Sequence, residues 1–237
     1  MRGDKTGTTL NSRVFEALRS EVLSGKLLPR QRLRVASLAS AHGVSLNVIR
    51  EALNRLAGQG LVDVEPKFGF SVRGLSTHDL RDLVAQRIVF ESIALRECIA
   101  RSCPEWQSEV LAAHHRLSKT PMKPDSDSTS LNQQWLARHD EFHRVMLEAC
   151  GSPRLYQMIR QMSEAAELYH RALLPVLARD GEMEAEHEQL LAAILAEDAD
   201  DAVRILTVHL EKTRDVMLPL LGEIESRSTP GDSTSMQ

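Results

Sequence analysis

The chain has 237 residues, enough for two domains, and its 42% hydrophobic and 26% charged residues are typical of a globular protein. No apolar run approaches the roughly 18 residues that span a membrane, and the polar N-terminus lacks a signal-peptide core, so we expect a cytoplasmic protein with no membrane partner. The net charge of −4 is unevenly divided: residues 1–75 carry 12 Lys or Arg against 6 Asp or Glu, and the remainder carries 17 against 27. The basic first third indicates contact with phosphates.

Apolar residues recur at helical spacing in the first part of the chain, for example at Val14, Leu18 and Val22. Glycines follow the first two of these segments, and Ser45 is a favourable N-cap for the third. Alternating apolar residues then predict two short strands joined by a turn, which form a two-stranded wing. The predicted elements are helices at 10–24, 35–42 and about 46–58, then strands at 61–65 and 70–72.

Beyond residue 75 only helical patterns occur, so we predict a second domain that is an all-α antiparallel bundle. The predicted fold class is therefore mainly α, with an N-terminal winged helix-turn-helix. The predicted divisions are a flexible arm (1–9), the winged domain (10–74), the helical domain (75–222) and a disordered tail (223–237). The predicted helices of the second domain cover 77–85 and 87–102, with the two continuous as an alternative, then 105–118, 131–149, 153–178, 182–197 and 199–221.

The cysteines number three, which is odd, and they lack CxxC spacing. This pattern argues against both a disulfide framework and a cysteine metal site. We expect all of them to be buried thiols: Cys98, Cys103 and Cys150.

The three helices and the wing form a layout in which the third helix can enter the major groove of DNA. The residues at its start, Ser45, Leu46 and Asn47, would face base edges, and Arg50 could reach a guanine or a phosphate. Arg34 is a candidate for a further phosphate contact. A protein-interaction module with arginines on a solvated face remains the alternative.

Residues 14–74 resemble the winged-helix domain of the GntR family of bacterial transcriptional regulators. The resemblance implies that Arg50 contacts DNA from the third helix and that Lys67, Gly69 and Phe70 contact it from the wing. This chain has Leu46 where the family usually has a base-contacting arginine, so we expect an altered operator preference. The residues that carry the resemblance are Leu18-Arg19, the turn 24–29, Leu38-Ala39, Gly43-Val44-Ser45, the run from Val48 to Leu56, Gly60-Leu61-Val62 and Gly69-Phe70-Ser71-Val72.

Nine histidines is a high number for a chain of this size. His139 and His143 are four residues apart, so a helix would direct both imidazoles from one face, as in two-ligand metal sites. Asp140 is turned by about 100° and is a weaker candidate. His187 and His209 lie on helices that would pack antiparallel and could reach the same centre. Surface or hydrogen-bonded histidines remain the ordinary alternative.

Residues 76–222 resemble the C-terminal domain, called FCD, of the fatty-acid-regulator branch of the GntR family. The likeness rests on Arg87 with Glu91, Phe142-His143, the run from Ala149 to Leu155, Glu186-His187, Ala193, Asp198, Ala202 and His209-Leu210. Many members bind a divalent metal through three histidines and an Asp or Asn, which here is replaced by His139. Imidazole-rich ligation suits zinc, nickel or copper. The resemblance thus predicts a metal centre at His139, His143, His187 and His209, with zinc first and nickel as the alternative.

The same resemblance implies a cavity for a small effector, commonly a carboxylate, beside the metal. Arg87 and Arg171 are candidates to bind it, because a guanidinium offers two parallel N–H groups to a carboxylate. Tyr169 is a weaker candidate for the cavity wall. An ordinary salt bridge is the alternative for either arginine.

Together these features predict a regulator that binds double-stranded operator DNA as a homodimer, represses a metabolic operon and responds to the effector. A metal-dependent hydrolase is the enzymatic alternative, although the sequence contains no HExxH. The other alternative is a helical interaction protein without sequence-specific DNA contact.

Overall fold

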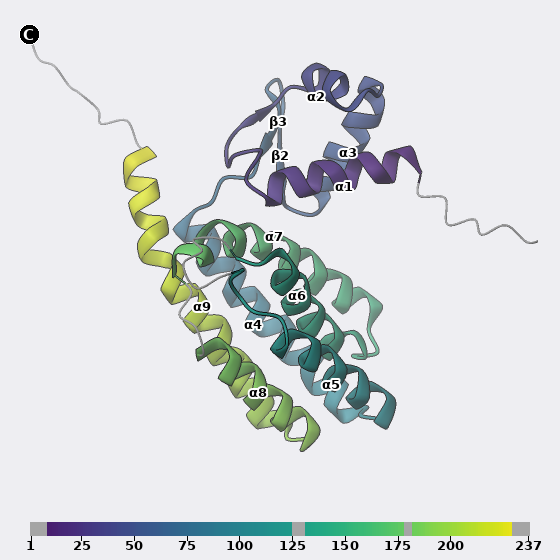
Figure 1. Ribbon diagram of the computed structural model, residues 1–237, viewed down its shortest axis with the longest axis vertical. Helices are drawn as coiled ribbons and strands as arrows, with labels where there is room; N and C mark the ends of the chain where they lie inside the picture. The colour runs from purple at the N-terminus through teal and green to yellow at the C-terminus, as the bar shows by residue number, and fades with distance from the viewer. Residues whose placement is uncertain (1–8, 125–130, 178–181, 229–237) are drawn as a thin grey trace, which may run out of the picture. The chain divides into compact units, whose positions relative to one another are not determined.

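The computed structural model describes residues 9–124, 131–177 and 182–228. Its internal contacts divide the chain into two compact units, which Figure 1 shows as a ribbon. The first unit is Met1–Leu75 with Gln161–Ala172, and the second is Ser76–Arg160 with Leu173–Gln237. Each unit is described by itself below.

The first unit contains three short helices, as predicted: α1 (Leu10–Leu23), α2 (Val35–His42) and α3 (Leu46–Gly58). The hydroxyl of Ser45 accepts a hydrogen bond from the backbone N–H of Val48, so this residue is the N-cap of α3. Gly43 ends α2 in the left-handed conformation that favours glycine. The apolar faces of these helices bury a common core that includes Leu18, Ile49, Leu53 and Leu56.

The wing is a three-stranded sheet, so the prediction of two strands was incomplete. β2 (Val62–Glu65) and β3 (Gly69–Val72) form the expected antiparallel hairpin. β1 (Arg32–Leu33) adds to the other edge of β3, giving the order β1-β3-β2. Two residues are too few to show alternation in a sequence, because the signal of a strand needs about four.

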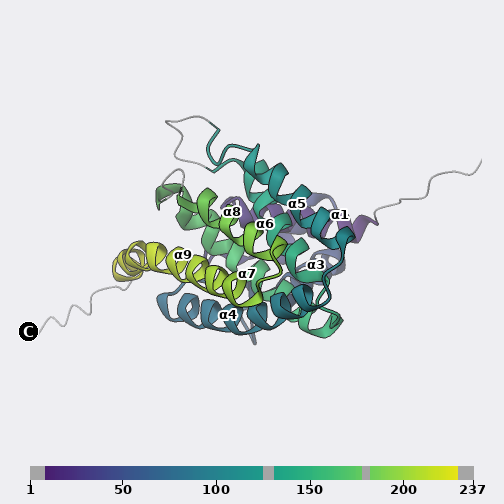
Figure 2. The ribbon, with the colours of Figure 1, turned by 90° about the horizontal axis from the view of Figure 1, so that it is seen from below.

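The second unit is made of helices, and its described part contains α4 (Thr77–Ala100), α5 (Pro104–Ser118), α6 (Gln133–Glu148), α8 (Glu182–Leu195) and α9 (Ala199–Ser228). α7 (Pro153–Leu177) contributes its two ends to this unit. Helix contacts run in a ring from α4 to α9, α8, α5, α6 and back to α4. Figure 2, seen from below, shows α4 beside α9 and α9 beside α8. This packing confirms the predicted all-α bundle.

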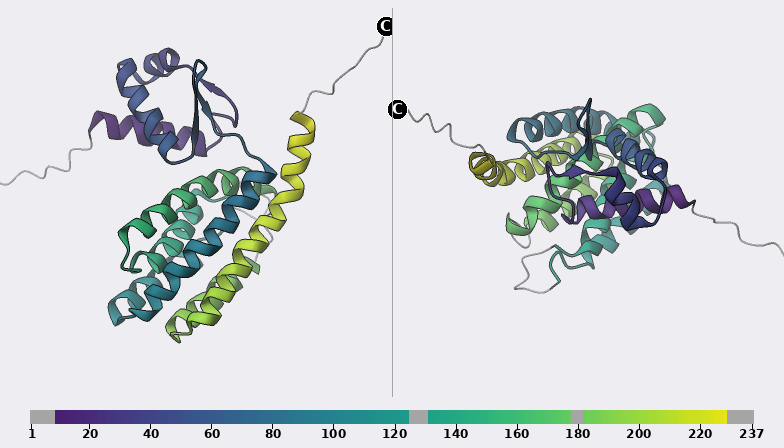
Figure 3. Two further views of the ribbon diagram at one scale, coloured as in Figure 1. Left: turned by 180° about the vertical axis from the view of Figure 1, so that it is seen from behind. Right: turned by 90° about the horizontal axis from the view of Figure 1, so that it is seen from above.

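α4 and α9 run antiparallel, side by side, as the left panel of Figure 3 shows. Arg96 of α4 bonds Asp200 of α9 at 2.7 Å, and the backbone N–H of Thr77 donates to Glu225 at 3.0 Å near the opposite ends. These two hydrogen bonds fix how the antiparallel helices are aligned. By interpolation between them, residue 209 of α9 lies opposite about residue 90 of α4.

Three sequence predictions need correction in this unit. α4 is continuous, so the separate helices 77–85 and 87–102 are one, which was the stated alternative. α9 continues to Ser228, so the predicted tail at 223–237 begins too early; the contact of Glu225 with the start of α4 stabilises those last turns. Cys103 is exposed at the start of α5, whereas Cys98 and Cys150 are buried as expected.

Residues 1–8 of the predicted arm and 229–237 of the predicted tail lie outside the described residues. Within the described helices, none is both long enough and apolar enough to cross a membrane.

Candidate DNA-binding surface and metal centre

The start of α3 presents the predicted base-reading residues to solvent. Leu46 is 47% exposed, and Asn47 and Arg50 are also exposed, because Ile49 and Leu53 take the opposite face into the core. Leu46 is the first residue of α3, so about half of this apolar side chain is open to a contact from outside the unit. Arg34, the N-cap of α2, is exposed as well.

The tip of the wing exposes Phe68 more than the predicted contact Phe70. Lys67 and Gly69 adopt positive φ angles of 76° and 85° in the tight turn between β2 and β3. Phe70 is half-buried and packs against the core of the unit. Phe68 is instead 61% exposed, and the guanidinium carbon of Arg32 lies 5.1 Å from its ring centre. Phe68 lies between the two predicted strands, in the segment predicted as a turn.

Four histidines from three helices converge in the interior of the second unit. His139 and His143 come from α6, His187 from α8 and His209 from α9. One ring nitrogen from each lies within 4.8 Å of the others, and all four residues are buried. Among the described residues, this is the group with the spacing to hold a metal ion. Asp140 is exposed and is not a member of the group.

Two further observations test whether these imidazoles suit a metal. The Nε2 atoms of His143 and His187 are 3.4 Å apart. Two nitrogen ligands on a tetrahedral zinc ion, each about 2.0–2.1 Å from the metal, are separated by about 3.4 Å. Burial is the main cause that lowers the pKa of His187 well below its usual value, with smaller contributions from His209 and His114. The imidazole of His187 is therefore neutral at pH 7, as a metal ligand must be.

Glu186 orients the fourth histidine. Nδ1 of His209 lies 2.8 Å from the carboxylate, and Lys212 binds its other oxygen at 2.7 Å. The hydrogen bond with His209 is the largest cause that lowers the pKa of Glu186, to about 2, while burial opposes it. An ionised carboxylate only accepts, so Nδ1 of His209 carries the hydrogen, and a metal would bind through Nε2. This carboxylate–histidine arrangement is common around zinc ions in proteins. The donor set therefore fits a divalent metal.

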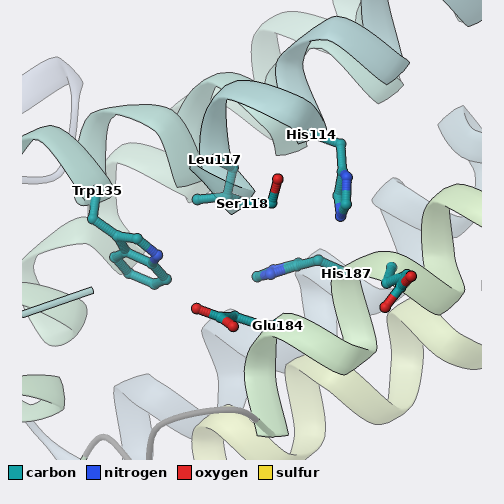
Figure 4. Close-up of a pocket in the computed structure, with 7 residues that line it drawn as sticks. His114, Leu117, Ser118, Trp135, Glu184 and His187 are labelled. Atoms are coloured by element: carbon teal, nitrogen blue, oxygen red, sulfur yellow. The ribbon is translucent and has the colours of Figure 1, made fainter. Parts of the chain in front are cut away.

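A pocket of about 220 Å³ opens beside the cluster (Figure 4). His187 lines it, and so does Trp135, whose ring stacks on His139 with centres 4.9 Å apart. Figure 4 shows the side chains of Trp135, Glu184 and His187 around the same space. The remaining lining residues are His114, Leu117, Ser118 and Glu188.

Arg87 and Glu91 form a buried ion pair on α4, with Nε donating to Oε1 at 2.6 Å. The antiparallel alignment of α4 and α9 puts this pair near the level of His209. The second oxygen of Glu91 is buried and has no hydrogen-bond partner in the described part of the chain. Arg87 thus forms the salt bridge that was predicted as the alternative to effector binding. The second carboxylate oxygen of Glu91 remains as a buried hydrogen-bond acceptor.

Arg171 and Tyr169 lie in the segment of α7 that is grouped with the first unit, so they belong to a different unit from the histidine cluster. Two hydrogen bonds join the guanidinium of Arg171 to Glu167, at 2.9 and 2.6 Å. Tyr169 is buried.

Comparison with known families agrees with this architecture. Residues 10–72 match the model for bacterial regulatory proteins of the gntR family, and residues 82–212 match the FCD domain. An uncharacterized HTH-type transcriptional regulator, BphR of Paraburkholderia xenovorans, is 31% identical over 86% of this chain and 83% of its own length. The HTH-type transcriptional repressor GlaR of Escherichia coli is 31% identical over 83% of this chain and 90% of its own.

Solved structures show the same fold. Escherichia coli McbR/YncC superposes with a TM-score of 0.72 at 22% identity, covering 90% of this chain and 98% of that one. A putative GntR regulator from a Rhodococcus species gives 0.71 at 23% identity, covering 88% and 97%. The matched families and relatives are transcriptional regulators and not enzymes. The resemblance seen in the sequence is confirmed: the chain belongs to the GntR family of DNA-binding transcriptional regulators and carries an FCD domain after its winged helix.

Proposed function

We propose that the protein represses a metabolic operon and that a small effector, bound in the metal-containing bundle, controls its binding to operator DNA. One observation carries this proposal: a buried cluster of four imidazoles lies on the same chain as a winged helix with an exposed recognition helix. The name of GlaR as a repressor supports the direction of regulation by similarity. Because operator DNA lies in the cytoplasm of bacteria, the protein acts there.

His139, His143, His187 and His209 would hold the metal, zinc in the first place and nickel as the alternative. Asp140 is the alternative metal ligand if His139 does not bind the metal. A divalent cation held there would supply positive charge to the bundle interior, which would attract an anionic ligand. Glu186 holds the ring of His209 in its ligand orientation.

A small carboxylate is the proposed class of effector. Arg87 is the main candidate to bind it, because its guanidinium is buried near the level of His209, where a charge-assisted hydrogen bond is strong. Tyr169 and Arg171 belong to the other unit, so their role as effector contacts stays a prediction from the family resemblance. Effector binding then shifts the bundle toward a state with lower affinity for the operator, and ligand relieves repression.

On the DNA side, Ser45, Leu46, Asn47 and Arg50 read the major groove. Lys67, Gly69 and Phe70 contact the backbone or minor groove from the wing, and Arg34 binds a phosphate. Two copies of the chain bind the two half-sites of a palindromic operator, so the active form is a homodimer.

Selection of sheared genomic DNA of the host by the purified protein, at near-physiological salt, tests the proposal. We expect a few palindromic sites to be enriched, and Arg50→Ala to lose that enrichment while still folding, since Arg50 is exposed. Uniform retention of fragments by the wild type would overturn sequence-specific regulation. The enzymes encoded beside enriched sites then define the carboxylates to test by thermal shift, with and without a chelator.

A further inference from the structure

The four histidines are closed off from solvent, since they are only 2–7% exposed. An ion that reaches them after folding must pass between helices. His187 is both a member of the cluster and part of the lining of the pocket in Figure 4, so the pocket borders the cluster. Trp135 also lines the pocket, and its ring stacks on His139, a member of the cluster.

The chemistry of this pocket suits a passing cation. Glu184 and Glu188 are exposed, lie four residues apart on α8 and therefore face the same side of that helix. Two carboxylates at the mouth of a cleft raise the local concentration of cations. Ser118 and His114, from α5, add a hydroxyl oxygen and an imidazole nitrogen along the lining. All of these are donors that a partly hydrated divalent ion can exchange for water.

We propose that this pocket is the route by which the divalent cation reaches and leaves the histidine cluster, with Glu184 and Glu188 collecting the ion at the pocket. The inference rests on the proposed metal centre. Glu184 and Glu188 then set the rate of metal exchange, whereas the four histidines set the equilibrium affinity for the metal.

Nickel binding to the full-length apoprotein, followed by stopped-flow fluorescence, measures these rates. Trp135 lies against His139, so its fluorescence reports an ion in the cluster, and Trp106 supplies a background. A competing chelator in the second syringe gives the dissociation rate. Equilibrium titration gives the Kd independently.

The first variant, Ser118→Phe, puts a large ring into the pocket. Because ions enter and leave by one route, we expect both rate constants to fall by at least tenfold and the Kd to stay within about twofold. Unchanged rates in a variant that folds and binds nickel with the wild-type Kd would show that ions take another path and would overturn the proposal.

The second variant, Glu184→Gln with Glu188→Gln, removes the two carboxylates. We expect the association rate to fall severalfold at low ionic strength and the difference from wild type to vanish at high salt, as screening requires. Glu105→Gln with Glu109→Gln is the matched control, because it changes the net charge equally at exposed positions of α5 outside the pocket lining. An equal effect of the control pair would assign the change to net charge and overturn the role of the pocket.

The variant His143→Ala distinguishes a wrong metal centre from a wrong route. His143→Ala should abolish tight nickel binding. If it binds as the wild type does, the proposed metal centre is wrong, and the route with it; if it does not bind and the pocket variants exchange metal at wild-type rates, only the route is wrong.

Discussion

Leu46 occupies the position at which the family resemblance leads us to expect a base-contacting arginine. It is the first residue of α3 and its side chain is 47% exposed. We predict that Leu46→Arg folds normally and changes the bases enriched at one position in each half-site, because arginine prefers guanine whereas leucine can only contact apolar groups such as the thymine methyl. Sequencing of selected DNA measures this. Leu46→Ala is the control, and an identical enriched site for Leu46→Arg would contradict a base contact at this position.

The cysteines provide a second prediction at the scale of single residues. Burial, with a smaller effect of Cys150, raises the pKa of Cys98 to about 12, so its thiol stays protonated and unreactive at pH 8. Cys150 is buried too, whereas Cys103 is exposed. We expect a disulfide reagent to label one thiol in the native protein and three after denaturation. Cys103→Ser should remove the native reaction; two rapidly reacting thiols in the folded wild type would count against this assignment.

At the scale of elements, the wing exposes an aromatic residue next to the predicted DNA contacts. Phe68 is 61% exposed, so Phe68→Ala should change the free energy of unfolding by no more than about 0.5 kcal/mol. If the ring is buried against the operator, the same change weakens DNA binding by about 1.5–3 kcal/mol, or about 10- to 150-fold. Binding isotherms at several salt concentrations measure it.

The salt dependence separates an apolar contact from a phosphate contact. Phe68→Ala should leave the slope of log K against log salt unchanged, because no counterion is released at an apolar ring. Lys67→Gln should reduce the slope by about 1. Wild-type affinity in Phe68→Ala would mean that the ring stays in solvent in the complex.

The helices were predictable because their apolar periodicity and caps are local. α2 occupies the predicted range of 35–42, and Ser45 caps α3 as expected. What the sequence could not predict depends on distant residues. β1 exists only because Arg32 and Leu33 pair with Ser71 and Phe70 of β3.

The same reasoning applies to the site. The spacing of His139 and His143 predicted a shared face of one helix. The convergence of His187 and His209 on that face was expected from antiparallel packing and the family resemblance, and the structure brings these rings together. The pairing of Arg87 with Glu91 was foreseen only as an alternative, and the pocket at Glu184 had no sequence signal, because its lining comes from three helices.

At the scale of the whole molecule, the metal centre should link ligand binding to the stability of the bundle. Its ligands come from α6, α8 and α9, so unfolding separates them, and an ion that binds only the folded state adds stability. Zinc at 100 times its Kd contributes about 2.7 kcal/mol. For a chain of this size that corresponds to a rise in Tm of about 5–10 °C over the chelated protein.

Glu186→Gln tests whether the orientation of His209 contributes to this stabilisation. The amide can turn its nitrogen toward His209 and has no charge for Lys212, so we expect zinc affinity to fall by about 10- to 100-fold and the zinc-induced rise in Tm to be at least halved at the same zinc concentration. Glu109→Gln, an exposed carboxylate of α5 outside the cluster, is the control and should keep the full rise. Calorimetry with and without chelator measures all three proteins. Equal melting of the wild type in both conditions would contradict a metal centre in the folded bundle, whereas a full rise in Glu186→Gln would show that the imidazole of His209 is held by its packing alone.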